Sequence, residues 1–230
     1  FFKEKPRDEI DDSPSPTRKK ARGKSWVGID YNVAKTKGFF YGAAICIFLT
    51  GMCLQGVGLV ASAHILAKGI STALVATVAS VSSLLLTCSK FLTGFMYDKL
   101  GLRKTISICC VASVLTMLSL AFMDNSSLGT TLAFIYAVVH AVALPLETVM
   151  LPLYAKDLFG QKSFAKVLGI FVSLNQIGYA FGDPLMNVFY TIFGSYDIGL
   201  LVMLIVTAIL IVALQFVISS SNKLKKLDGI

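Results

Sequence analysis

The chain has 230 residues, of which 55% are hydrophobic and only 15% are charged, and its mean hydropathy is +0.74. A soluble domain of this length needs a more strongly charged surface, so a single water-soluble core is excluded. The net charge of +8 does not indicate a nucleic-acid partner, because the basic residues gather at one predicted membrane face and no aromatic-basic binding motif accompanies them.

Residues 1–37 are predicted to be a disordered, basic cytoplasmic linker. They combine Pro6, Pro14 and Pro16 with mixed charges and few apolar groups, a composition that buries too little surface to become ordered. The chain opens with Phe1 rather than Met and lacks a signal-peptide pattern, so we expect it to be part of a longer protein.

Six long apolar stretches follow the linker, and each is near or above the ~20 residues that a helix needs to cross hydrocarbon. These stretches predict an all-α membrane protein whose transmembrane domain covers residues 38–218 and whose cytoplasmic tail covers residues 219–230. The predicted helices run over residues 38–62, 71–96, 105–123, 129–153, 167–192 and 197–218.

Lys and Arg are concentrated before the first span, after the last span and in every second loop. Ten precede the first span, three lie between spans two and three, and three lie between spans four and five, whereas the opposite loops hold only Lys68. By the positive-inside rule both termini are cytoplasmic, which an even number of spans requires. The lipid bilayer of the cell membrane is therefore the predicted environment of this multi-pass chain.

Strongly polar side chains are costly in hydrocarbon, so their positions within the spans point to function. They occur in spans one, two, four and five, whereas span three has none and span six has only Gln215 near its inner end. The six spans thus show the order polar, polar, apolar twice. This order is expected if a three-helix unit is repeated with its third helix against lipid. The residues are Gln55, Lys90, His140, Glu147, Asn175, Gln176, Asp183 and Asn187.

Small and polar residues also share one face of span two and one face of span five, because positions alternating by three and four align on a helix. Close packing between membrane helices is the alternative explanation for such faces. We name them the span-two seam and the span-five seam. The first comprises Ala73, Ala76, Ser80, Ser83, Thr87, Lys90 and Gly94, and the second comprises Gly169, Ser173, Gln176, Ala180, Asp183 and Asn187.

The polar residues have two candidate roles. Substrate binding is assigned to Lys90, Gln55, Asn175 and Gln176, and proton coupling to Glu147, His140 and Asp183, whose side chains can take up and release protons. Lys90 and Glu147 each lie eight residues, about 12 Å, from a cytoplasmic helix end, so we hypothesise a contact between them. Snorkelling of Lys90 to the interface remains the alternative.

The five cysteines indicate neither a metal site nor a redox site. Their number is odd, they lie inside apolar spans, and they lack zinc or redox spacing, so we expect small core residues and no cofactor. They are Cys46, Cys53, Cys88, Cys109 and Cys110.

The loop after span two carries a recognisable motif. It resembles the G-x-x-x-D-[RK]-x-G-[RK]-[RK] signature of the major facilitator superfamily, with Leu102 where a basic residue is commonest. Gly94 is expected to allow close helix contact and Gly101 to permit the tight turn. The residues assigned to this gating loop are Gly94, Asp98, Lys99, Gly101, Arg103 and Lys104.

The resemblance implies that this chain is the C-terminal half of a twelve-helix transporter. In that superfamily each half consists of two inverted three-helix repeats, and solutes move by alternating access about a midplane site. The partner would be the missing N-terminal six-helix half or a second copy of this chain. A coupling ion, H⁺, or a counter-solute would accompany the solute.

Finer matches resemble the oxalate/formate antiporter and monocarboxylate porter branch. They include Asp157 to Gly160, Gly178 to Pro184 and Gly194 to Tyr196. Relatives in this branch carry an arginine four residues before the first glycine of the motif, where it binds substrate carboxylate, and this chain has Lys90 there. The implied function is a secondary active symporter or antiporter for a small solute, with an organic anion or monocarboxylate as the candidate.

Other functions find less support in the sequence. A channel or pore subunit with a voltage sensor would need a span with repeated Arg or Lys, and no span has more than one cation. An enzyme is not indicated, since the chain has only His64 and His140 and no glycine-rich turn around a nucleophile. A non-transporting membrane receptor is the remaining alternative.

Overall fold

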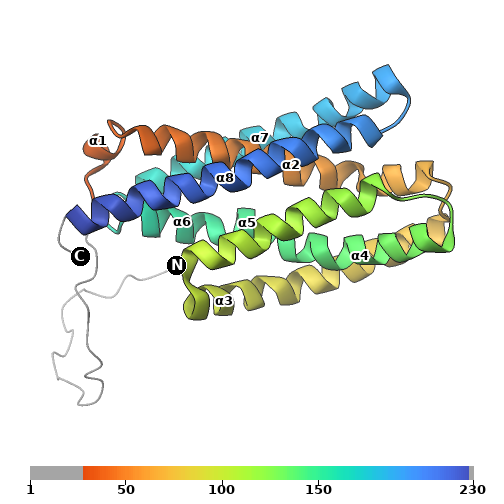
Figure 1. Ribbon diagram of the computed structural model, residues 1–230, viewed down its shortest axis with the longest axis horizontal. Coiled ribbons are helices and arrows are strands. Elements are labelled where there is room, and N and C mark those ends of the chain that lie inside the picture. Colours follow the sequence, from red (N-terminus) through yellow and green to blue (C-terminus); the bar gives the residue numbers. More distant parts are fainter. Residues whose placement is uncertain (1–27, 228–230) are drawn as a thin grey trace, which may run out of the picture.

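The computed structural model describes residues 28–227, and these contain helices and no strand, in agreement with the predicted all-α class. Figure 1 shows an elongated bundle whose long helices run between two ends. The end that holds Gly101 is called the motif end, and the end that holds Lys68 is called the far end. The helices are α1 (Tyr31–Ala34), α2 (Gly38–Ala67), α3 (Thr72–Ala121), α4 (Ser127–Ala143), α5 (Pro145–Thr148), α6 (Met150–Phe159), α7 (Phe164–Phe193) and α8 (Asp197–Leu227).

Helix α3 contains two of the predicted spans, residues 71–96 and 105–123. Its 50 residues would extend about 75 Å if straight, far beyond the ~30 Å of a hydrocarbon core. Gly101 interrupts it with φ 78° and ψ 171°, a conformation essentially restricted to glycine, and the chain reverses direction there (Figure 1). The predicted turn at Gly101 is therefore confirmed.

Within residues 28–227, five helices are long and apolar enough to cross a membrane, and the doubled-back α3 counts as one of them. The others are α2, the stretch Ser127–Thr148, α7 and the stretch Asp197–Lys223. Except for the fourth, the predicted spans thus fall on long helices of the bundle, to within two residues at their ends.

The fourth predicted span, residues 129–153, is not the continuous helix that we expected. It is divided into α4, α5 and α6, with breaks at Leu144 and Val149. The first break occurs at Pro145. The proline ring clashes with the preceding turn, and the proline nitrogen has no hydrogen to donate to the helix. The break leaves Glu147 in a four-residue helix.

Helices α2 and α7 cross in backbone contact. A methyl group added to Gly56 would come within 2.8 Å of the Gly182 backbone, and one added to Gly178 would meet the Phe48 carbonyl. Asn175, also on α7, donates from Nδ2 to the Ile47 carbonyl of α2 over 3.4 Å. Small residues therefore allow α2 and α7 to form one tightly packed pair, as in many membrane helix pairs.

Buried hydrophobic side chains form two clusters, one toward each end of the bundle. The edge-on aromatic rings of Phe40, Phe159 and Phe171 lie in the motif-end cluster. Met117, Leu120 and Met186 lie in the far-end cluster. The two clusters support α2 and α7 on both sides of their crossing.

The last part of the predicted linker is ordered against the α6–α7 loop. Ile29 donates its backbone N–H to the Phe159 carbonyl over 3.1 Å, and Ser163 Oγ donates to the Ile29 carbonyl over 2.8 Å. Asp30 accepts from Lys162 Nζ at 3.2 Å. Residues 1–27 of that linker lie outside the described residues. At the other terminus, α8 continues beyond the predicted limit at residue 218 into the predicted tail.

Candidate functional site

A hydrogen-bonded polar pair links α2 to the broken α4–α5–α6 segment. Gln55 donates from Nε2 to Glu147 Oε2 over 2.8 Å. Glu147 is only 5% exposed, and its second oxygen, Oε1, has no hydrogen-bond partner within residues 28–227. Because α5 begins at the proline break, the carboxyl lies in an interrupted part of the helix.

His140 lies near the end of α4 and is 6% exposed. Its ring stacks on Tyr136, with centroids 5.0 Å apart and planes 18° apart, and its Nδ1 has no hydrogen-bond partner in the described chain. A methyl group on Gly58 of α2 would come within 3.2 Å of His140 Nε2, so a small residue there leaves space for the ring.

A cavity of about 180 Å³ opens beside His140 between α2, α3 and α4. This volume is large enough to hold several water molecules. We call it the His140 cavity. Its polar and small lining residues are Gly58, Ser62, Ser82, Ser83, Tyr136 and His140.

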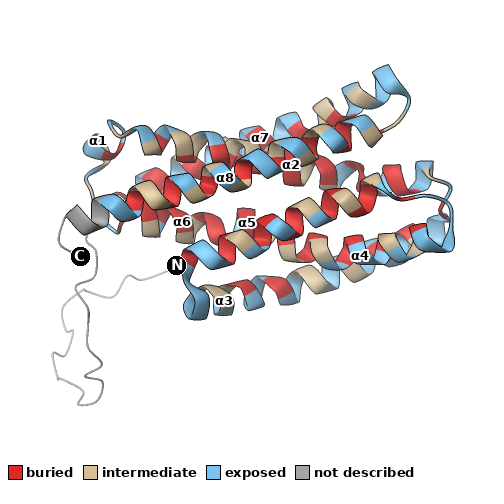
Figure 2. Cartoon of the chain, in the orientation of Figure 1, coloured by how far each residue is buried: buried red, intermediate tan, exposed pale blue. Residues whose placement is uncertain are grey.

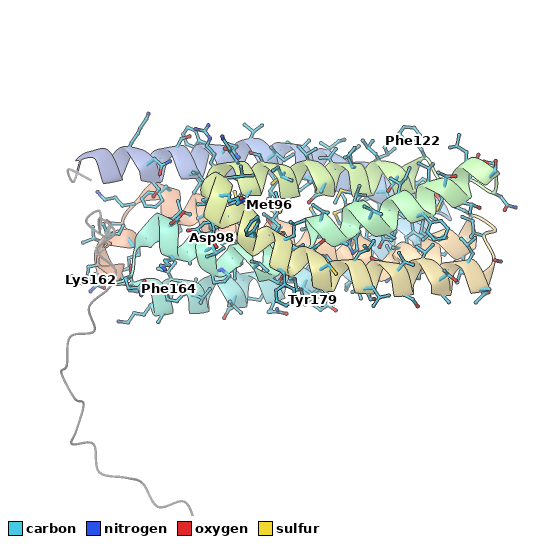
Figure 3. All side chains as sticks on the ribbon, turned by 90° about the horizontal axis from the view of Figure 1, so that it is seen from below. Met96, Asp98, Phe122, Lys162, Phe164 and Tyr179 are labelled. Atoms are coloured by element: carbon cyan, nitrogen blue, oxygen red, sulfur yellow. The ribbon has the colours of Figure 1, made fainter. Side chains whose placement is uncertain are left out.

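The span-two and span-five seams lie on the surface of the described chain. Every member of the span-two seam is exposed except Gly94, and every member of the span-five seam is exposed except Asp183, these two being half-buried. Figure 3 shows α8 along one edge of the bundle, and α7, with the labelled Tyr179, along the opposite edge together with the first half of α3. The two seams thus belong to helices on the same side of the bundle.

Lys90 is exposed on α3 and forms no ion pair within the described residues, whereas Glu147 is buried and bonded to Gln55. The hypothesised Lys90–Glu147 contact is therefore wrong for this structure. The physical reason is that equal depth does not imply the same helix face, and Glu147 is turned toward α2.

The candidate residues of α7 separate into internal and exposed groups. Asn175 is buried and bonded to α2, so it is committed to helix packing. Gln176 is exposed on the next face. Asp183 is half-buried and accepts from Asn187 Nδ2 over 3.1 Å, and Asn187 Oδ1 accepts from the Tyr196 hydroxyl over 3.2 Å.

The motif loop is exposed at the bend of α3 (Figure 2). Asp98 and Lys104 are exposed, and Lys99 Nζ lies 4.3 Å from the centroid of the Phe95 ring. Arg103 donates from Nε to Gln215 Oε1 of α8 over 2.8 Å. The loop is thereby joined to α8.

Two further features of the motif end were unexpected. Tyr97 donates its hydroxyl hydrogen to Asp157 Oδ1 of α6 over 3.1 Å. A methyl group on Gly94 would meet nothing within 4 Å, so the predicted close helix contact is not made within the described chain.

Tyr136 and Ser82 are polar cavity residues that the sequence reasoning missed. Tyr136 lies four residues before His140, so a helical projection would have placed both on one face. Ser82 was missed because it lies outside the span-two seam. Four of the cysteines are buried, as expected of small core residues, but the expectation is wrong for Cys88, which is exposed.

Comparison with known protein families gives one match. The family model described as Major Facilitator Superfamily matches residues 13–228. No curated protein matches the chain.

Proposed function

We propose, from the premise that this chain belongs to the Major Facilitator Superfamily, that it is part of a secondary active transporter for a small solute. Membership makes the chain a multi-pass membrane protein of the facilitator type.

The observation that carries the proposal is the exposure of both seams. Hydroxyl, amide and ammonium groups on α3 and α7 would be costly against lipid tails. A partner face or a water-filled pathway solvates such groups, and these helices lie on one side of the bundle. We therefore propose that the seams face a solute pathway shared with a second six-helix half, supplied by a preceding segment or a second copy.

We propose that the chain crosses the membrane six times as two inverted three-helix repeats. The first comprises α2 and the two halves of α3, and the second comprises α4–α5–α6, α7 and α8. The motif end is cytoplasmic in this arrangement, since the basic loops and both ends of the transmembrane domain lie there. A cell-membrane location follows the same proposal.

Glu147 is the proposed proton-coupling group. It is buried, its Oε1 is unpaired within residues 28–227, and Gln55 can bond either form of the carboxyl. His140 and Asp183 are secondary candidates. Symport with H⁺ uses such a group, whereas exchange against a counter-solute other than H⁺ does not require one.

Lys90 supports an organic anion, including a monocarboxylate, as the solute. It is an exposed cation on the span-two seam, and no carboxylate of the described chain neutralises it. Its ammonium group attracts a carboxylate as a point charge rather than through paired parallel hydrogen bonds. Gln176 on the span-five seam is exposed and available to bond the same solute.

Uptake of radiolabelled monocarboxylates into proteoliposomes tests the proposal, using the full protein with and without an inward proton gradient. Glu147→Gln should remove the response to the gradient, and Lys90→Gln should reduce uptake at least tenfold. Asp124→Asn, in the far-end loop, and Lys156→Gln, at an exposed position on α6, are the matched controls and should behave like the parent. Uptake that ignores both the gradient and the Glu147 change would overturn proton coupling.

A further inference from the structure

We infer that the His140 cavity binds the uncharged, hydrogen-bonding body of a monocarboxylate whose charged end lies at Lys90. The inference rests on the proposed transport function and goes further by assigning the two ends of the solute to two places.

The lining offers hydrogen bonds but no charge. Four polar lining residues, Ser62, Ser82, Tyr136 and His140, have side chains that make no hydrogen bond to the rest of the described chain. Ser83 already donates to the Ala79 carbonyl over 3.0 Å, so its oxygen is left to accept. A ligand with hydroxyl or other neutral polar groups satisfies this set, because each of these groups gains a partner.

The remaining walls are apolar. They include Ile65, Val75, Val78, Leu86 and Leu144. A body with an apolar ring or chain and a polar edge therefore fits the cavity better than a fully hydrated polar one. A second carboxylate does not fit, since no Lys or Arg lines the cavity and an unpaired buried charge is strongly disfavoured.

Lys90 lies on the helix face that leads out of the cavity. It follows the lining residue Leu86 by four positions and Ser83 by seven, so all three share one face of α3. At 1.5 Å per residue the axial separations are about 6 Å and about 10 Å. A solute whose apolar body begins about 6 Å from its carboxylate and whose neutral polar group lies within about 10 Å of it spans both places, whereas a two-carbon acid does not.

The test compares binding of three radiolabelled probes to the full protein in proteoliposomes. They are acetate, which is short, glutarate, which carries two charges, and 3-(4-hydroxyphenyl)propionate, which joins a carboxylate to a phenol. We expect 3-(4-hydroxyphenyl)propionate to bind at least tenfold more tightly than the other two. Lys90→Gln should weaken its binding at least tenfold.

Variants in the cavity lining test binding of the uncharged body of the solute independently of binding of its carboxylate. Ser82→Leu fills the cavity and should weaken 3-(4-hydroxyphenyl)propionate at least tenfold while changing acetate less than twofold. Thr77→Leu, the same type of change at an exposed position of α3 outside the lining, is the matched control and should leave both unchanged. Ser82→Ala, which removes only the hydroxyl, should weaken the phenolic acid about three- to tenfold and serves if the leucine variant does not fold.

The outcomes distinguish this inference from the proposed function. If Lys90→Gln weakens all three probes but Ser82→Leu and Ser82→Ala leave 3-(4-hydroxyphenyl)propionate unchanged, the cavity inference is overturned and carboxylate transport stands. If folded parent protein binds none of the probes, the organic-anion proposal itself is overturned, and the cavity inference fails with it.

Discussion

Gln55 on α2 and Glu147 on α5 are joined by a 2.8 Å hydrogen bond between residues far apart in the sequence. The bond ties the first long helix to the segment that Pro145 interrupts. It gives the Glu147 carboxyl a neutral partner inside the bundle. The Gln55 amide can hydrogen-bond the carboxyl in its protonated and in its ionised form.

Replacing Gln55 by Leu should destabilise the fold by about 1 kcal/mol, because the buried Glu147 carboxyl loses its hydrogen-bond donor. The measurement is unfolding of detergent-solubilised protein, combined with Glu147→Gln and the double variant in a thermodynamic cycle. Gln176→Leu, at an exposed position of α7, is the control and should cost much less. Equal losses for the two glutamine variants would show that the bond contributes nothing specific.

Gly182→Ala should destabilise the protein by about 1–3 kcal/mol, because the added methyl group meets the backbone of α2 and neither helix can move aside without losing other contacts. Gly169→Ala on the same helix is the control. A methyl group there meets nothing within 4 Å, and alanine favours the helix by about 0.5–1 kcal/mol. The midpoint temperature of thermal unfolding should therefore fall for Gly182→Ala and rise for Gly169→Ala. A change of the same sign in both variants would contradict the close crossing of α2 and α7.

Gly101→Ala should cost about 1–3 kcal/mol, since φ 78° with ψ 171° is strained for any residue with a Cβ atom. The same change at Gly94, which is helical and has no neighbour within 4 Å, should be neutral or slightly stabilising for this chain. Circular dichroism during thermal unfolding measures both. A Gly101→Ala variant as stable as the parent would mean that the reversal of α3 does not need glycine.

Docking of residues 28–34 on the α6–α7 loop should depend on pH through Asp30. The Asn32 backbone N–H and then the Lys162 ammonium group lower the pKa of the Asp30 carboxyl below its ordinary 3.8. Its contribution is therefore present above about pH 3.8 and is lost as the pH falls through the lower, folded value.

Hydrogen exchange of the Ile29 amide, which is bonded to Phe159, reports this docking. After correction for intrinsic exchange rates, protection should hold between pH 7 and pH 5 and decrease below about pH 3.8. Asp30→Asn should remove that decrease. A variant that keeps the same pH dependence would assign it to another group.

The sequence by itself determined the positions of the long apolar helices, the turn at Gly101 and which polar residues lie within the spans. These features are local: hydropathy over about 20 residues sets a span, and one glycine conformation sets a reversal. The seams on α3 and α7 were also readable, because helical periodicity alone decides which residues share a face. The break at Pro145 also has a local cause, but the continuous apolar sequence around Pro145 predicted one unbroken helix.

The tertiary structure alone decided which polar residues meet. Depth along a helix suggested Lys90 as the partner of Glu147, but rotation of α5 about its axis turns the carboxyl toward Gln55. Asn175 and Gln176 are neighbours in sequence, but the crossing of α2 and α7 buries Asn175 and leaves Gln176 exposed. Such pairings depend on crossing positions between helices distant in the chain, which no periodicity within one helix contains.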